Sequence, residues 1–371
     1  MENIKNKARV LALYLPQFHP IPENDEWWGK GFTEWTNVGK AKKYFRGHYQ
    51  PRVPADLGYY DLRVPETRQA QADMAKEYGI EGFLYWHYWF GNGKRLLERP
   101  FTEVLLSGKP DFPFALAWAN ETWKGFQHGL KNRNVLIEQE YPGEEDFINH
   151  FNAILPALKD NRYIKVNGKP LFMVYKPKLL PDPKYFIDLW QSLAKENGLS
   201  GIYFIAHSMG KFEHDGQLEG ETLAQMLEYG FDAVNFVRLG GYLERRSFYS
   251  KIMRRLIKIF RGVPLSYSYK KVYPFFSSSI DSNLCVIPSI IPGWDHSARS
   301  GRNGHILTDS NPKLFEKHVD TVIKCIKDKP EEERLVIIKS WNEWAEGNYM
   351  EPDLRFGRKF LEVLGNKLKD I

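Results

Sequence analysis

Two glutamates near the C-terminus have the spacing that acid–base chemistry on a glycosidic bond requires. Glu343 and Glu346 stand three residues apart in the run RLVIIKSWNEWAEGNYMEPD, directly after an apolar stretch that predicts a buried strand. Cleaving a glycosidic bond needs one carboxyl group that donates a proton and one that accepts it, with aromatic rings to stack on the sugar. Trp341 and Trp344 alternate with the two acids, each two residues before one of them. The alternative is a helix N-terminus, where glutamates are common because they complement the dipole, but that position does not require tryptophans. We therefore predict Glu343 and Glu346 as the catalytic pair.

Eight short apolar runs alternate with helical patterns along the chain. Several runs are hydrophobic at nearly every position, as strands buried on both faces are. The expected strands are 10–14, 82–86, 114–118, 171–175, 202–206, 233–237, 284–290 and 335–338, and the expected helices are 65–78, 97–106, 144–158, 184–196, 221–229, 312–326 and 354–368. This order predicts an α/β fold, a single (β/α)8 TIM barrel with long βα loops, as one domain over residues 1–371. The rival, a doubly wound open sheet, would place a glycine-rich phosphate loop after the first strand. The chain has LPQFHPIPENDEWW there.

Polar and aromatic residues follow most of the expected strands at their carboxyl ends. In a barrel of this kind the active site forms where strands pass into βα loops. Each residue alone has a simpler interpretation; His87 and His207, for example, can be buried histidines with satisfied hydrogen bonds. Their convergence from several strands favours substrate binding instead. The candidates from this argument are Tyr14, Trp35, His87, Trp118, Asn120, Glu121, Trp123, Tyr175, His207, Trp294, Asp295, Trp341 and Asn342.

A second choice of catalytic acids comes from two Asn-Glu pairs at strand ends, Asn120-Glu121 and Asn342-Glu343. Some barrel glycosidases place an acid/base glutamate after an asparagine on strands four and seven, whereas these pairs follow the third and eighth expected strands. The local pair Glu343 and Glu346 avoids that mismatch, because a helical turn after Trp341 would direct both carboxyls into the cleft. Glu121 is therefore expected to bind sugar.

The composition narrows the functional classes. The net charge of +6 is scattered along 371 residues, so we do not predict nucleic-acid binding. Aromatic residues make up 15% of the chain, and many adjoin polar residues, which suits a saccharide ligand. Two cysteines cannot build a disulfide framework. The N-terminus has no signal-peptide pattern and no stretch reaches 18 apolar residues, so a cytoplasmic location is expected.

Four histidines, His19, His87, His207 and His296, fall at four different strand ends, where a metal cluster is geometrically allowed. No HxH or HExxH spacing supports such a site. A serine or cysteine triad lacks its GxSxG elbow in this sequence. We predict neither a metal nor a cofactor.

At these residues the sequence resembles a known family. The run WNEWAEG looks like the NEWHEG motif of glycoside hydrolase family 99, the endo-α-mannosidase and endo-α-mannanase family. It is closer still to the WbsX-type, family 99-like proteins, which occur with polysaccharide and O-antigen biosynthesis genes and are often called glycosyltransferases. The segments LALYLPQFHPIPENDEWWGKGFTEWTNV, GFLYWHYWF and FALAWANETW also look like the WbsX pattern. The resemblance is weakest at about 240–282, where an insertion is expected.

The family 99 resemblance implies a (β/α)8 barrel, no metal cofactor and retention of anomeric configuration through a 1,2-anhydro sugar. It makes Glu343 the base that takes the proton of the 2-hydroxyl group, and Glu346 the acid/base that protonates the leaving oxygen. The run from Pro292 to Asp295, with Arg299, resembles a family loop that lies over the sugar, and Tyr175 falls where the family has a tyrosine. This chain departs from the family at Ala345, where the family has histidine, and at Trp294, where it has tyrosine.

Three functional hypotheses follow. The first is a retaining glycoside hydrolase acting on a bacterial polysaccharide or a lipid-linked oligosaccharide, with α-linked, mannose-like 2-hydroxyl chemistry. The alternative is a glycosyltransferase in O-antigen or polysaccharide biosynthesis, as the WbsX label suggests. A nucleotide-sugar transferase usually needs a diphosphate site, and the sequence has neither a DxD motif nor a glycine-rich loop for one. The third is a barrel that binds glycans without catalysis.

Residues 250–261, SKIMRRLIKIFR, alternate apolar and basic side chains at helical spacing. Such a helix can lie on an anionic membrane, which would suit a lipid-linked substrate and a peripheral position at the inner membrane. The alternative is an amphipathic helix packed on the barrel.

Overall fold

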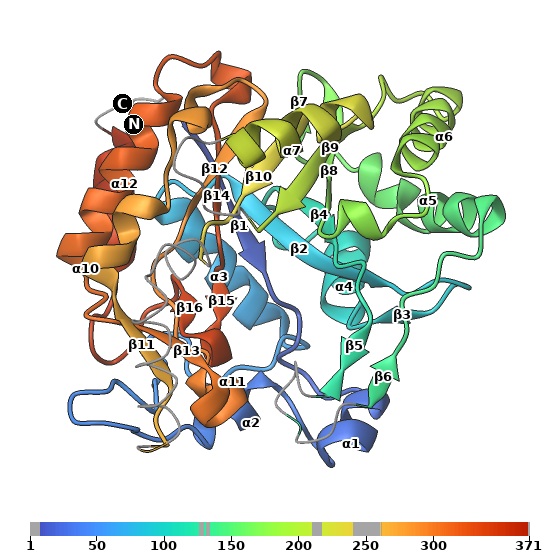
Figure 1. Ribbon diagram of the computed structural model, residues 1–371. Helices are drawn as coiled ribbons and strands as arrows, with labels where there is room; N and C mark the ends of the chain where they lie inside the picture. Colours follow the sequence, from blue (N-terminus) through green and yellow to red (C-terminus); the bar gives the residue numbers. More distant parts are fainter. Residues whose placement is uncertain are drawn as a thin grey trace.

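The computed structural model describes residues 8–369, apart from 126–129, 131–133, 210–216, 240–259 and 261. Eight parallel strands form its centre (Figure 1). Each strand pairs with the next along the chain, and the last pairs with the first, for example through Leu11 opposite Ile337, so the sheet closes. The barrel strands are β1 (Arg9–Tyr14), β2 (Gly82–Trp89), β4 (Phe114–Trp118), β8 (Lys169–Val174), β9 (Tyr203–Ser208), β10 (Ala233–Phe236), β12 (Val286–Ile290) and β14 (Leu335–Ile338). The predicted (β/α)8 barrel is confirmed.

The strands are apolar at nearly every position because both of their faces are covered. Every residue of β2 is buried, with one face toward the barrel interior and the other toward the helices. The strand begins with Gly82 for a steric reason: a Cβ atom there would lie 2.5 Å from the carbonyl oxygen of Pro113. That oxygen accepts a hydrogen bond from the backbone N–H of Phe83 at 3.0 Å.

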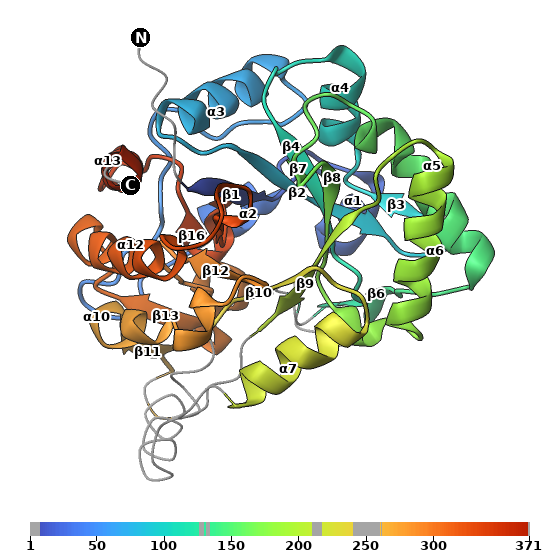
Figure 2. The ribbon, with the colours of Figure 1, turned by 90° about the horizontal axis from the view of Figure 1, so that it is seen from above.

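Helices surround the barrel when it is viewed along its axis (Figure 2). In α12 the buried residues Phe315, Val319, Val322 and Ile326 recur at helical spacing, and the side chain of Asn311 caps the first turn. The larger helices are α3 (Pro65–Glu77), α4 (Arg99–Ser107), α5 (Glu144–Leu158), α6 (Pro183–Glu196), α7 (Gln217–Glu228), α12 (Pro312–Ile326) and α13 (Lys359–Lys369). Their sequence periodicity therefore placed them close to where the structure has them.

The last helix starts later than the sequence pattern suggests. We expected it from residue 354, but α13 begins at Lys359. The carboxylate of Asp353 accepts hydrogen bonds from the backbone N–H groups of Arg355 and Phe356 at 2.9 and 2.7 Å. These bonds stabilise a turn that precedes the helix.

Short elements extend the loops at the carboxyl ends of the strands. The helices are α1 (Pro22–Trp28), α2 (Glu34–Gly39), α10 (Tyr269–Val272) and α11 (Ser297–Ser300). The strand pairs are β5 (Trp123–Lys124) with β6 (Val135–Ile137), β11 (Leu265–Ser268) with β13 (His305–Thr308), and β15 (Asn342–Glu343) with β16 (Asn348–Tyr349). At the barrel itself, β3 (Arg95–Leu96) pairs with β2 and β7 (Lys165–Val166) with β8. The described part of the expected insertion thus includes β11 and α10.

The amphipathic segment 250–261 lies outside the described residues except for Phe260, so its contact with a membrane stays a prediction. Within the described residues, none of the helices has the length and apolar character needed to span a bilayer.

Candidate active site

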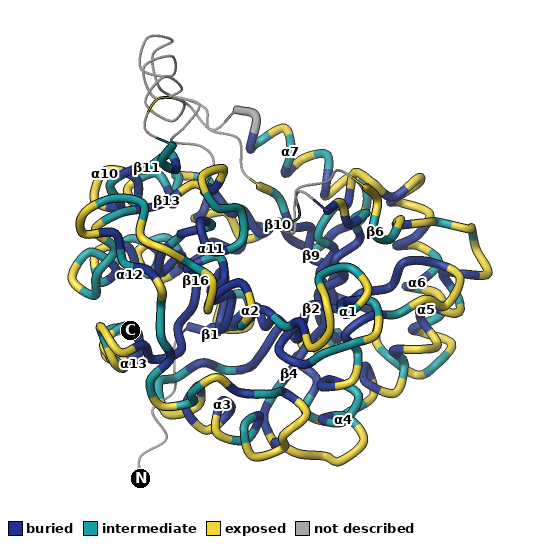
Figure 3. Tube along the Cα trace, turned by 90° about the horizontal axis from the view of Figure 1, so that it is seen from below, coloured by how far each residue is buried: buried dark blue, intermediate teal, exposed yellow. Residues whose placement is uncertain are grey.

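The two predicted catalytic glutamates lie in a tight hairpin directly after β14. β15 and β16 pair antiparallel, with Glu343 opposite Asn348, and a 3-10 turn from Trp344 to Glu346 joins them. Gly347 follows the turn with a positive φ of 57°, which glycine adopts at little cost. This hairpin contacts α2 and α11, and Figure 3 looks onto that end of the barrel. The turn therefore brings both acids to one site.

Glu343 is a buried acid with two polar partners. The indole N–H of Trp86 donates to its Oε1 at 3.2 Å, and Lys339 Nζ lies 3.3 Å from its Oε2. Burial and then the negative charge of Glu346 raise the pKa of Glu343 to about 8, against the opposing charge of Lys339. Glu343 is therefore protonated at neutral pH.

Glu346 has the opposite electrostatic environment. Its Oε1 lies 2.5 Å from Arg299 Nη1 and 3.6 Å from His296 Nε2, and its Oε2 lies 3.9 Å from Lys339 Nζ. Burial disfavours its charge, but Arg299 together with hydrogen bonds from Glu343 and His296 holds the pKa of Glu346 well below its ordinary value. The pair thus shares one proton, which resides on Glu343, although the family resemblance makes Glu343 the base.

Several predicted substrate-binding residues surround this pair. Arg299 bridges Glu346 and Glu34, and Nη2 lies 3.1 Å from Glu34 Oε2. The ring of Trp294 lies 5.5 Å from Lys339 Nζ. Tyr175 contacts the ring of Trp86, and the negative charges of Glu121, Glu346 and Glu343 add to burial in raising its pKa.

His207 and Glu121 belong to the same neighbourhood. The His207 ring packs on Tyr175 with centroids 5.0 Å apart, and its Nδ1 is 3.0 Å from Asn235 Oδ1. Burial lowers the pKa of His207 to about 3, so the imidazole is neutral. Burial raises the pKa of Glu121, with the charge of Lys176 opposing it and that of Glu346 adding to it.

Three predicted residues point into the layer between strands and helices instead. The hydroxyl of Tyr14 donates to Gln71 of α3 at 2.7 Å. His87 lies 2.8 Å from His150 of α5, ring nitrogen to ring nitrogen, and Trp118 packs on His150 as well. Side chains alternate along a strand, and on β2 the neighbour Trp86 is the one that contacts Glu343.

The remaining predicted residues make structural contacts. Asn342 accepts from Leu15 N at 2.7 Å and donates to Leu15 O at 3.0 Å. The side-chain amide of Asn120 likewise donates to the backbone carbonyl of Lys176 and accepts from its backbone N–H. The others are packed in aromatic clusters: Trp35 on Tyr60 and Trp344, Trp123 on Tyr88 and Phe90, and Trp341 on Phe83.

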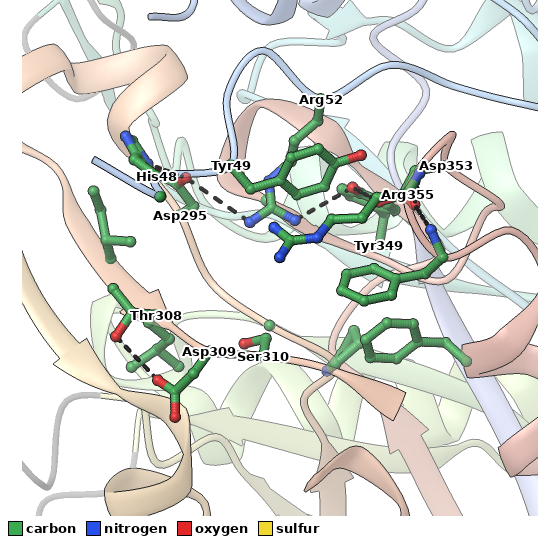
Figure 4. Close-up of a pocket in the computed structure, with 18 of the residues that line it drawn as sticks. His48, Tyr49, Arg52, Asp295, Thr308, Asp309, Ser310, Tyr349, Asp353 and Arg355 are labelled. Atoms are coloured by element: carbon green, nitrogen blue, oxygen red, sulfur yellow. Dashed lines mark hydrogen bonds and ion pairs between the residues drawn. The ribbon is translucent and has the colours of Figure 1, made fainter. Parts of the chain in front are cut away.

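Asp295 is fully buried, and its carboxylate contacts polar side chains of the first βα loop. Its Oδ2 lies 2.8 Å from His48 Nε2 and accepts from Gln50 at 2.9 Å, while Arg52 Nη2 is 3.8 Å away. Figure 4 shows Asp295, His48 and Arg52 at the edge of a cavity of about 330 Å³. The backbone N–H of Asp295 donates to the carbonyl of Glu346 at 2.6 Å, so this residue anchors the turn that carries the two glutamates.

The sequence argument did not select Trp86 or Lys339, and it placed Glu34 and His296 at strand ends without choosing them as substrate-binding residues. Lys339 stands four residues before Glu343, and that spacing is the one signal that was available for it. Selecting Trp86 from the sequence would require knowing which face of β2 points into the barrel. Glu34 contacts Arg299 where the first and seventh βα loops meet, and His296 contacts Glu346 where the seventh loop meets the hairpin that follows β14.

Comparisons with known proteins agree with this architecture. A family model described as "Glycosyltransferase WbsX" matches residues 10–364. Two proteins named "Uncharacterized protein WxcX", from two strains of Xanthomonas campestris pv. campestris, are each 36% identical over 359 residues, which is 96% of this chain and 49% of each relative. The chain thus spans about half the length of these curated relatives.

Two solved structures show the same fold. One, described as a glycoside hydrolase-like protein, has a TM-score of 0.59 and 15% identity, covering 97% of this chain and 94% of the other. The family 99 endo-α-mannosidase from Bacteroides thetaiotaomicron, in complex with bis-tris-propane, has a TM-score of 0.57 and 15% identity, covering 98% and 96%. At such identities the likeness shows the fold alone. The match of the family model over nearly all of the sequence shows that the chain belongs to the WbsX family.

Proposed function

We propose that the protein is a retaining glycoside hydrolase acting on an α-linked bacterial polysaccharide or lipid-linked oligosaccharide. The observation that carries the proposal is a pair of neighbouring carboxyls, the buried Glu343 and the partly buried Glu346, which share one proton at the carboxyl end of the barrel. General acid–base cleavage of a glycosidic bond needs one protonated and one ionised carboxyl.

The first step, as the family resemblance implies, starts with Glu343 taking the proton of the sugar 2-hydroxyl group. The 2-oxygen then bonds to the anomeric carbon, the glycosidic bond breaks, and the leaving oxygen takes a proton from Glu346. In the second step Glu346 takes a proton from water, the hydroxide bonds to the anomeric carbon, and the 2-oxygen leaves that carbon and recovers its proton. Two displacements at one carbon retain its configuration.

These roles require the resting proton to pass from Glu343 to Glu346 before the first step. The hydrogen bond between the two carboxyls provides the route. A substrate hydroxyl that donates to Glu343 favours the transfer, because hydrogen bonds to a carboxylate stabilise its ionised form. Lys339 favours it further, since its ammonium lies beside Glu343.

The test is hydrolysis of α-linked glycans by wild type and Glu343→Gln, with the anomeric configuration followed by NMR. We expect cleavage with retention in wild type and cleavage slowed by about 10²-fold or more in the variant. Cleavage with inversion would contradict the two-step route, and equal cleavage by the variant would contradict the assignment of Glu343.

The description of the family model favours one second candidate, a glycosyltransferase. That function predicts release of a nucleoside diphosphate when the protein is incubated with nucleotide sugars and a glycan acceptor. Release that depends on the acceptor, without hydrolysis of any glycan, would replace the hydrolase proposal.

A further inference from the structure

A groove of about 1090 Å³ opens beside the catalytic pair, between two loops at the carboxyl end of the barrel. One wall is the segment 40–44 that follows α2, and the other is the segment 294–305 that follows β12. Its lining includes His296 and Arg299, which both contact Glu346. Two residues of the groove lining therefore also contact the proposed active site.

The groove is lined by cations. Lys40, Lys42, Arg299 and Arg302 contribute to it, and its described lining contains no aspartate or glutamate. Arg299 is bound to Glu346 and Glu34. No ion pair joins the other three to a carboxylate within the described part of the chain. We call the set Lys40, Lys42 and Arg302 the groove cations.

Tyr44 holds the two walls together. Its backbone N–H donates to His48 Nδ1 at 3.2 Å, and His48 Nε2 lies 2.8 Å from Asp295 in the opposite loop. A Cβ atom at Gly301 would lie 3.1 Å from the Tyr44 hydroxyl oxygen, so the side chain packs closely on that loop. The Lys42 ammonium lies 5.5 Å from the centre of the Tyr44 ring. The walls that bear the cations are thus positioned before any ligand binds, which lowers the entropic cost of binding.

The chemistry of the lining identifies the kind of ligand. Partial desolvation lowers the pKa of Lys40, with the charge of Glu34 opposing it, so an anion would stabilise its charged form. The indole of Trp294 stacks on His296 with centroids 5.8 Å apart and offers an aromatic surface between the groove and Lys339. Aromatic faces suit a sugar ring, and ammonium and guanidinium groups suit carboxylate or phosphate oxygens.

We propose that the groove cations bind a carboxylate or phosphate group carried by the same saccharide whose glycosidic bond lies at Glu343 and Glu346. The substrate is then an acidic glycan, and its charged group lies on the side of Arg299 and Trp294. This inference rests on the proposed function for the position of the scissile bond. The binding of the anion itself does not depend on catalysis.

Calorimetric titration with three probes tests the proposal: a mannuronic acid tetrasaccharide, inorganic pyrophosphate, and neutral mannotetraose. The probes are titrated into wild type, into a Lys40→Gln/Lys42→Gln/Arg302→Gln variant, and into a Lys195→Gln/Lys313→Gln/Lys317→Gln control. The control removes the same charge from exposed positions on α6 and α12. Circular dichroism checks that both variants fold.

We expect at least one anionic probe to bind wild type and the control alike, and to bind the groove variant about tenfold or more weakly. Raising the salt from about 50 to about 500 mM should weaken that binding because the groove is open to solvent. Binding of the uronate alone assigns the anion to an acidic sugar, and binding of pyrophosphate assigns it to a phosphoryl group. Mannotetraose should bind both variants equally.

Failure of this inference is distinguishable from failure of the proposed function. The anionic probes should still bind Glu343→Gln, which cannot complete catalysis. If wild type hydrolyses a neutral glycan but neither anion binds, or if the groove variant and the control bind the anions equally, the inference is overturned while the hydrolase proposal stands. If the anions bind as expected but no glycan is cleaved, the inference that the groove binds an anion is supported and the proposed hydrolase function is contradicted.

Discussion

The ammonium of Lys339 lies 3.3 Å from Oε2 of Glu343, so a buried cation accompanies the acid that carries the proton. Burial opposes the charge of Lys339, but the two glutamates outweigh it and raise the pKa of Lys339 above its ordinary value. With Glu343 protonated, Lys339 and Arg299 face the carboxylates of Glu346 and Glu34. The buried charges then balance, which explains how the site tolerates so many ionisable groups.

Substituting each glutamate in turn should show which of the two donates the proton to the leaving group and which acts as the base. We expect Glu343→Gln and Glu346→Gln each to lower kcat/KM on an unactivated glycan by about 10²–10⁴-fold. An aryl glycoside whose leaving group needs no proton should restore much of the activity of the variant that lacks the acid. The roles implied by the family resemblance predict restoration in Glu346→Gln. Restoration in Glu343→Gln alone would assign proton donation to Glu343 instead, and restoration in neither would count against acid catalysis.

Stability should fall as the pH rises, through the titration of Glu343. Its pKa is about 8 in the folded protein and 4.5 ordinarily, so the folded state retains a proton that the unfolded chain has lost. The resulting stabilisation is fully present below pH 4.5 and is lost as the pH rises through 8, on the order of a few kcal/mol. Denaturant titrations at about pH 5 and about pH 9 measure it. Wild type should lose more stability than Glu343→Gln over that interval; equal losses would show that Glu343 does not hold the proton.

Lys339 should determine the pH dependence of activity. Lys339→Met removes the cation that lowers the pKa of Glu343, so that pKa should rise. The alkaline limb of the pH–rate profile should then shift to higher pH by about one pH unit or more. Lys339→Arg keeps the charge and should keep the limb near its wild-type position. An unchanged profile in Lys339→Met would show that Lys339 has no influence on the titration of Glu343.

Gly347 should be required because the turn that carries Glu343 and Glu346 is packed against its surroundings. A Cβ atom there would lie 2.7 Å from Asp295 Cβ and 3.1 Å from Arg52 Cζ, at a φ of +57°. Gly357 is a matched control, since it has a φ of +54° with no atom within 4 Å of an added Cβ. Gly357→Ala should cost about 1 kcal/mol from backbone strain alone, whereas Gly347→Ala should cost more and also reduce activity. Equal costs in thermal or denaturant unfolding would refute the steric argument.

Much of the architecture follows from local sequence. Continuous apolar runs such as residues 335–338 can only be strands buried on both faces, and their alternation with amphipathic helices such as α12 leads to a closed parallel barrel. The proposed catalytic pair could also be selected from the sequence, because Glu343 and Glu346 are three residues apart on one loop. Neighbours so close in the chain stay close in space under almost any fold of that loop.

The tertiary structure decided what the sequence left open. Successive side chains on β2 face opposite sides of the sheet, so Trp86 contacts Glu343 whereas its neighbour His87 contacts His150. Both residues are aromatic and buried on a strand that is covered on both sides, so no local sequence pattern shows which one faces the site. The meeting of Arg299 with Glu34 and Glu346 joins loops from opposite ends of the chain. The location of the shared proton depends on these distant charges and on burial, because a pKa is determined by the surroundings of a group in space. Local sequence therefore specifies the two acids and the barrel that carries them, whereas the packing of distant loops sets which acid holds the proton.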